Sequence, residues 1–302
     1  MGRWLKGHPA SPARPGGQAP GWHPVEWLCE AGGTGFQLFF GFSAVALFES
    51  PYSPLHPDLP GWARFVVIGS CFGILGAMVA VSPLGRRSGA HLNPSVTLGF
   101  VLRGHTSVRD AAGFVAGQTV GALGAAALFA EVWGRWATSV DTARTAPAAG
   151  MAAWAAAGIE AGLTSGLILV IFTMLSSART ARWTPVVLVG AVAGLILLGA
   201  PRTGASLNPA RTAGPDIVTA LYPAVWAYMV GPPAGAVVAV ALFDLVARGR
   251  RTLTAKLFHD PAYPSVHAST LPARPHPGTS RPAPAAAPAA AAERARPAVD
   301  PG

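Results

Sequence analysis

The stretches SGAHLNPSVTLGF (residues 88–100) and TGASLNPARTAGP (residues 203–215) carry nearly the same phrase, about 115 residues apart. The likeness extends further, because GQTVGA at 117–122 returns as GPPAGA at 231–236 and Glu30 has a counterpart in Glu160. These paired features predict a chain made of two related halves, at about residues 26–133 and 151–247.

The composition indicates a membrane protein. The chain has 302 residues, a mean hydropathy of +0.40 and 12% charged residues, whereas an average soluble domain carries about 25% charged residues. A helix needs about 20 mostly apolar residues to cross a bilayer. The sequence predicts six such helices, in an all-α fold, over residues 27–48, 62–82, 109–132, 152–175, 184–200 and 222–247.

Three spans in each half leave the chain on the opposite side of the membrane, so the second half must be inserted upside down. Arginine and lysine gather in the connections that share a side with both termini, and fewer lie in the others. By the positive-inside rule, both termini are predicted to be cytoplasmic. Residues 1–25 and the Pro/Ala-rich residues 248–302 are expected to form a disordered leader and a disordered tail.

The net charge of +9 raises the question of nucleic acid, but basic and aromatic residues are not interleaved in the way that single-stranded nucleic acid requires. Cys29 and Cys71 both lie in apolar runs and are expected to be packed thiols rather than a disulfide. No phosphate-binding glycine loop and no carboxylate relay appear in the sequence, so we expect neither a cofactor nor energy coupling.

Each copy of the repeated phrase contains Asn followed by Pro, which is a good helix start. Asn caps the first turn, and Pro at the first helical position gives up an N–H that would lack a partner. Asn93 and Asn208 are therefore predicted to begin half-helices, PSVTLGFVL and PARTAGPDIV, which enter from opposite faces and meet near the bilayer midplane.

Non-helical backbone at that depth is tolerated where it is buried or lines a wet cavity. The backbone carbonyls of the preceding residues are predicted to line a lumen, namely those of Gly89, Ala90 and His91 and of Gly204, Ala205 and Ser206. Two positive helix ends and Arg211 disfavour cations. Arg211 is expected to face water, because an arginine at this depth is costly elsewhere.

The chain resembles the major intrinsic protein family, the aquaporins and aquaglyceroporins, over about residues 26–247. The resemblance depends on SGAHLNPSVT, TGASLNPARTAGP, Glu30, Glu160, Gln118 and YMVGPPAGA. It implies a bacterial channel of the plasma (inner) membrane, a right-handed bundle of six spans with two re-entrant half-helices, and a homotetramer with one pore per protomer. Glu30 and Glu160 would support the half-helices. The implied pore centre comprises Asn93, Pro94, Ser95, Asn208, Pro209 and Ala210.

The implied selectivity filter contains Arg211, Ile196, Ala205 and either Phe72 or Gly73. Water-selective members usually have His where this chain has Ile196, and often Cys at Ala205. Ser95 in place of the commoner Ala is met in some nodulin-like members. A wider, less polar opening predicts passage of glycerol or undissociated metalloid acids as well as water. A strictly water-selective channel is the alternative, and a membrane-embedded enzyme and a closed scaffold member remain as other classes.

Overall fold

The computed structural model describes residues 21–56, 58–247 and 249–271. Residues 1–20 of the predicted leader lie outside the described residues. The same is true of residue 248 and residues 272–302 of the predicted tail. Six helices in the described part are long and apolar enough to cross a membrane. They are α1 (Pro24–Glu49), α2 (Gly61–Val81), α5 (Val108–Trp133), α7 (Ala153–Leu175), α9 (Thr184–Thr203) and α11 (Val225–Val246).

The predicted spans correspond to these helices with small shifts at the ends. The fifth helix continues beyond residue 200 to Thr203, and the sixth begins at Val225 rather than at residue 222. The first begins at Pro24, inside the predicted leader, because Pro fits the first helical position.

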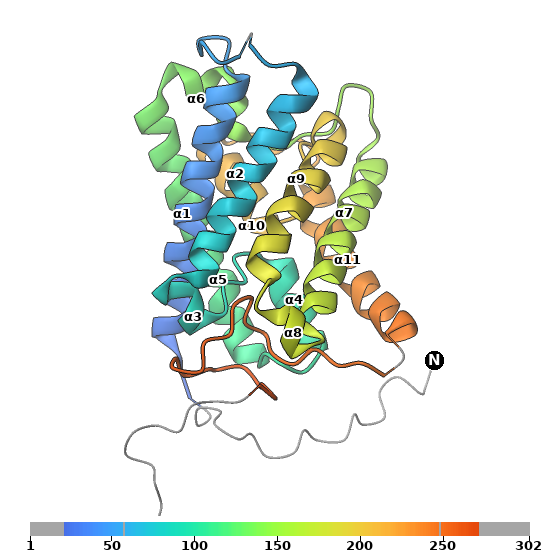
Figure 1. Cartoon of the computed structure of the whole chain (residues 1–302). Coiled ribbons are helices and arrows are strands. Elements are labelled where there is room, and N and C mark those ends of the chain that lie inside the picture. Colours follow the sequence, from blue (N-terminus) through green and yellow to red (C-terminus); the bar gives the residue numbers. More distant parts are fainter. Residues whose placement is uncertain (1–20, 57, 248, 272–302) are drawn as a thin grey trace, which may run out of the picture.

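Short helices connect the spans. They are α3 (Pro83–Ser88), α4 (Pro94–Leu102), α6 (Arg135–Ser139), the 3₁₀ helix η1 (Asp141–Ala143), α8 (Ala178–Ala181) and α10 (Pro209–Thr219). The helices form one bundle (Figure 1), in which α3 and α8 lie at one end and α6 lies at the other. We call the end with α3, α8 and the start of α1 the terminal face, and the other end the opposite face.

The two halves pack in matching ways. Helix α1 packs on α5 as α7 packs on α11, and α2 of the first half packs on α9 of the second. Each half-helix contacts the third span of the other half, α4 on α11 and α10 on α5. This exchange joins the halves into a single unit around a shared axis.

Glycine makes the closest of these helix contacts. A Cβ on Gly121 of α5 would lie 2.2 Å from the carbonyl oxygen of Ala31 in α1. In the second half, a Cβ on Gly235 of α11 would lie 2.3 Å from the carbonyl oxygen of Ala161 in α7. The repeated GxxxGA segments therefore hold the first and third spans of each half together at the same point, because any larger residue would push the helices apart.

The C-terminal region differs from the prediction. Residues 249–271, which we call the cap segment, were expected to be part of a disordered tail, but they cross the terminal face of the bundle (Figure 1). Ala255, Lys256 and His267 are buried there. The expectation depended on a Pro/Ala-rich composition that is concentrated in residues 272–302. Residues 249–271 instead satisfy polar groups on the ends of the helices.

Candidate pore

Two re-entrant loops, residues 89–93 and 204–208, lead into the half-helices α4 and α10. Each loop holds two residues other than glycine in the left-handed region of φ, at Ala90 and Leu92 in the first and at Ala205 and Leu207 in the second, with φ between 48° and 56°. Such conformations cost energy and persist only where the surroundings fix them. Because these residues occupy equivalent positions in both loops, the two halves share backbone conformation as well as sequence.

Two buried carboxylates hold these loops. Glu30 of α1 accepts hydrogen bonds from the backbone N–H of His91 and of Leu92, at 3.0 and 2.7 Å. Glu160 of α7 accepts the same bonds from Ser206 and Leu207, at 2.9 and 2.7 Å. Both glutamates are 0% exposed. These bonds connect α1 and α7 to the two loops.

A hydroxyl group adds a third bond to each carboxylate. Ser88 donates to Glu30 at 2.7 Å, and Thr203, its counterpart, donates to Glu160 at 2.7 Å. In the first half Gln118 donates to Glu30 as well, at 2.8 Å. The second half has Pro232 at the position of Gln118, so there the carboxylate has one partner fewer.

The two asparagines meet at the loop tips. The side-chain Oδ1 of Asn93 accepts from the N–H of Ser95 at 2.8 Å, and that of Asn208 accepts from Ala210 and Arg211 at 3.0 and 3.3 Å. The Nδ2 of each asparagine donates across the repeat, Asn93 to the Leu207 carbonyl and Asn208 to the Leu92 carbonyl, both at 2.8 Å. Each amide has a second N–H, which stays available to a solute.

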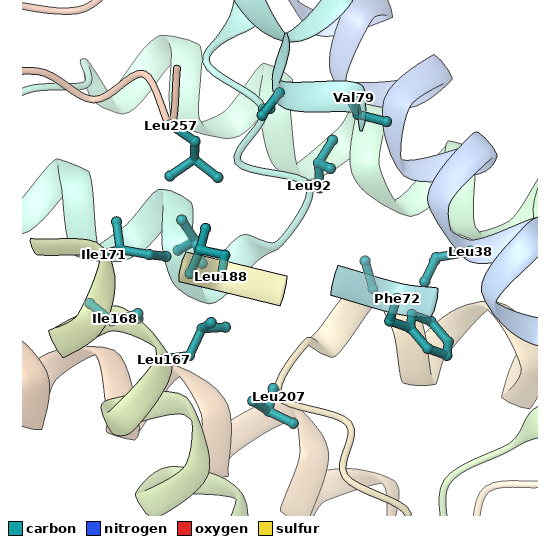
Figure 2. Packing of buried hydrophobic residues seen from close by; sticks show 14 of the residues in the cluster. Leu38, Phe72, Val79, Leu92, Leu167, Ile168, Ile171, Leu188, Leu207 and Leu257 are labelled. Atoms are coloured by element: carbon teal, nitrogen blue, oxygen red, sulfur yellow. The ribbon is translucent and has the colours of Figure 1, made fainter. Parts of the chain in front are cut away.

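A cavity of about 250 Å³ runs along these groups. Its lining includes Ala90, His91, Leu92, Asn93, Gly204, Ala205, Ser206, Leu207, Asn208 and Arg211. Apolar side chains from α1, α2, α7 and α9 complete the wall, among them Leu38, Phe72, Leu167 and Leu188 (Figure 2). A predominantly apolar wall with a few fixed polar groups is typical of sites for small molecules.

Other predicted pore-centre residues lie away from this cavity. Ser95, Pro209 and Ala210 are buried but do not belong to its lining, and neither does the partly buried Pro94. Ala210 belongs to the buried hydrophobic core. The hydroxyl of Ser95 has no hydrogen-bond partner among the described residues.

Gly89 corrects the prediction of three lumen-facing carbonyls in the first loop. Its carbonyl oxygen accepts the backbone N–H of Leu257 at 3.0 Å, and Gly89 is not part of the cavity lining. The cap segment thus uses the Gly89 carbonyl, which was predicted to face the lumen, as a hydrogen-bond acceptor. Nothing local in SGAHLNP signals this, because the donor comes from 168 residues further along the chain.

Arg211 lies toward the opposite face. Its Nη1 donates to the Ala143 carbonyl at 2.6 Å, and its guanidinium stands 5.2 Å from the ring centre of Phe42. Sequence reasoning missed Ala143 and Phe42, since any residue offers a carbonyl and an aromatic residue in an apolar span carries no special signal. Ala143 has a positive φ, and its carbonyl points toward Arg211. From the sequence, this segment was expected only to connect two spans.

All the predicted filter residues line the same cavity, namely Phe72, Gly73, Ile196, Ala205 and Arg211. The ring of Phe72 lies 6.5 Å from that of Phe42, which contacts Arg211. Gly73 serves helix packing instead, because a Cβ there would lie 2.7 Å from the Cα of Val189 in α9. Between the two alternatives, Phe72 is the one whose side chain reaches the surroundings of Arg211.

Residues 24–243 match the sequence model of the family described as Major intrinsic protein. The chain belongs to the major intrinsic protein family. It is therefore a multi-pass membrane channel of the kind that passes water and small neutral solutes. The inverted repeat is consistent with this membership. So are the hydrogen bonds that Asn93 and Asn208 make across the repeat and those that Glu30 and Glu160 make to the loops.

Named relatives give the same family. Aquaporin-6 of Rattus norvegicus is 31% identical over 217 residues, which cover 70% of this chain and 73% of the relative. Aquaporin NIP1-4 of Oryza sativa subsp. japonica is 32% identical over 221 residues, covering 72% and 76%. A solved aquaglyceroporin from Plasmodium falciparum shares the fold with a TM-score of 0.59, 21% identity and coverage of 74% of this chain and 96% of its own.

Proposed function

We propose that this member of the major intrinsic protein family passes water together with glycerol or undissociated metalloid acids, by downhill diffusion. The observation that carries the proposal is the composition of the wall near Arg211. Ile196 and Ala205 line the cavity where water-selective members usually have His and often Cys. An aliphatic and a small side chain leave room for a carbon backbone and accept its apolar side, while Arg211 and the loop carbonyls bind hydroxyl groups.

We also propose that Phe72 completes this filter and that Asn93 and Asn208 mark the pore centre. Their spare amide N–H groups and the carbonyls of the two loops replace the hydrogen bonds that a neutral solute loses on leaving water. A cation finds two helix N-termini and Arg211, and the carboxylate that lines the cavity, Glu49, is paired with Arg64 at 3.1 Å, so ions and protons are excluded.

The expected assembly and location belong to the same proposal. We infer a homotetramer with one pore per protomer, in the plasma membrane. Of the described residues, Arg86, Arg87, Arg103, Arg179 and Arg182 lie in connections on the terminal face. Arg250, Arg251 and Lys256 add to this face, whereas the opposite face has Arg64, Arg135, Arg144 and Arg202. The excess of positive charge on the terminal face supports a cytoplasmic terminal face and cytoplasmic termini. Native mass spectrometry of the full chain tests the tetramer.

The function is tested with proteoliposomes under sucrose, glycerol and urea gradients, followed by light scattering. We expect rapid shrinkage under sucrose and, under glycerol, shrinkage followed by fast re-swelling as glycerol enters. Fast water flow without glycerol entry contradicts the wide filter and favours the alternative, a strictly water-selective channel. No flow above that of empty liposomes contradicts both.

A further inference from the structure

The cap segment is bound to the terminal face by backbone and side-chain contacts along its length. Leu257 donates its N–H to the Gly89 carbonyl at 3.0 Å, and the ring of His91 bonds the Ala255 carbonyl at 2.9 Å. Further along, His267 bonds the Ser88 carbonyl and the Thr106 hydroxyl, at 2.6 and 3.0 Å. The partners are the first re-entrant loop and its flanks, so the segment docks on the pore itself.

The cap segment has a counterpart on the opposite face. Residues 134–152, which we call the connecting segment, follow the third span of the first half just as the cap segment follows that of the second. The connecting segment contains Thr-Ala-Arg at 142–144, and the cap segment contains Thr-Ala-Lys at 254–256. The family match ends at residue 243, yet the repeat of this chain extends beyond it.

The two segments make comparable contacts, each with the loop or the half-helix of the other half. The carbonyl of Ala143 accepts from Arg211, and the carbonyl of Ala255, in the matching place, bonds His91. Thr145 lies against Gly204, where a Cβ would come within 3.1 Å, and the cap segment lies against Gly89, where a Cβ would come within 2.9 Å of the Ala255 carbonyl oxygen. On the opposite face this arrangement builds the surroundings of the filter arginine.

At the terminal face, the matching arrangement places a leucine in the pore. Leu257 is 7% exposed and lines the same cavity as Asn93 and Asn208. Figure 2 shows its side chain on the cap segment, near Ile171 of α7 and Leu188 of α9, which line the cavity too. A solute at this point loses the Gly89 carbonyl as an acceptor and meets aliphatic side chains instead.

Lys256 fastens the leucine from outside the lumen. Its side chain is 0% exposed and is not part of the cavity lining. Its ammonium group donates to the carbonyls of Arg86, Tyr263 and Pro264, which use all three of its N–H groups. Arg86 in turn pairs with Asp260 at 3.0 Å, so the lysine closes the cap segment on itself and on α3.

We propose that the cap segment forms an intramolecular cap on the terminal mouth of the pore, in which Leu257 is a second constriction that limits flux independently of the filter at Arg211. The proposal rests on the channel function. It makes Leu257 a flux-limiting residue and Lys256 a positioning residue that acts through the cap.

The test compares the full-length chain with Leu257→Ala and with Leu253→Ala in proteoliposomes. Leu253 belongs to the same segment but not to the cavity lining, so its substitution repeats the chemical change away from the lumen. We expect Leu257→Ala to raise water permeability about fivefold, which corresponds to about 1 kcal/mol in the barrier, and Leu253→Ala to leave it near the parent value. If the parent conducts water and Leu257→Ala has the same water permeability, Leu257 is not a constriction and the proposal is overturned.

A second measurement reports docking without reference to flux. Lys256 is the one lysine within the described part of the chain, and a lysine-specific protease reaches it only when the cap leaves the bundle. We expect the folded parent to resist cleavage at Lys256, and rapid cleavage would overturn the cap. If neither the parent nor Leu257→Ala conducts water, the channel function itself fails and the constriction with it, while the protease result still decides docking.

Discussion

Asn93 donates its side-chain Nδ2 to the carbonyl oxygen of Leu207 at 2.8 Å, and so reaches from one half of the chain into the other. Asn208 returns the same bond to Leu92. Each asparagine thus caps its own half-helix with Oδ1 and fixes the opposite loop with Nδ2. These bonds fix the orientation of both side-chain amides. The second N–H of each Nδ2 group therefore has a direction that is set by the fold before any solute binds.

Replacing Glu160 by Ala should destabilise the protein by several kcal/mol, because it leaves the N–H groups of Ser206 and Leu207 buried without an acceptor, at about 1–3 kcal/mol each. The Thr203 hydroxyl would keep only its 3.4 Å contact with the Gly199 carbonyl. Glu160→Gln keeps one acceptor oxygen and should lose less. Thermal unfolding in detergent measures both. Equal melting temperatures for the two variants would show that the carboxylate does not hold the second loop.

Arg211→Val should admit protons and small cations. The substitution removes the positive charge beside the lumen and frees the Ala143 carbonyl, an acceptor that can then bind a passing cation. A pH-sensitive dye inside proteoliposomes reports the flux. Arg202→Val is the matched control, because Arg202 is exposed and does not line the cavity. Equal proton flux in the parent and in Arg211→Val would mean that the arginine is not at the constriction.

Ile196→His should lower glycerol permeability much more than water permeability. The imidazole narrows the wall beside Arg211 and adds a polar group, which favours water over a carbon backbone. Ile196→Val, which keeps an aliphatic side chain at the same position, should behave like the parent. The ratio of glycerol to water permeability from one set of light-scattering traces decides the matter, and an unchanged ratio in Ile196→His would contradict the filter assignment.

Ser95→Ala should stabilise the protein by about 1 kcal/mol, since it removes a buried hydroxyl that has no partner among the described residues. Permeability should not change, because Ser95 does not line the cavity. Thermal unfolding and light scattering give the two values. A change in glycerol flux at constant stability would instead place this hydroxyl in the lumen.

Water permeability should fall as the pH rises from about 8 toward about 10, where a free lysine loses its proton. Burial lowers the pKa of Lys256 to about 8, while Asp260 and Glu26 act in the opposite direction and Arg87 acts with it. A released cap therefore binds more protons than a docked one in this range, so docking strengthens with rising pH.

The control for this pH dependence is Lys256→Met, which has no amine to titrate at that position. Its permeability should stay level over the same range, whereas that of the parent declines. A decline of the same size in both would assign the effect to another group and leave the lysine without a part in it.

The sequence alone determined the elements that depend on neighbours along the chain. Apolar runs of sufficient length define the six spans, and Asn-Pro defines the starts of α4 and α10, because hydropathy and capping act within a few residues. The repeat adds information at longer range, because two similar phrases in two inverted halves imply that Glu30 and Glu160 face equivalent loops. This is why the core of the candidate site could be predicted.

Only the tertiary structure decided which residues lie at the two ends of the cavity. Ala143 holds Arg211 through a carbonyl that every residue type possesses, and Leu257 lines the cavity from a segment that was assigned to a Pro/Ala-rich disordered tail. It also separated Phe72, whose ring lies beside Phe42, from Gly73, which packs against Val189. Such contacts join residues far apart in the chain, and their free energy comes from the fit between surfaces that exist only once the bundle has formed.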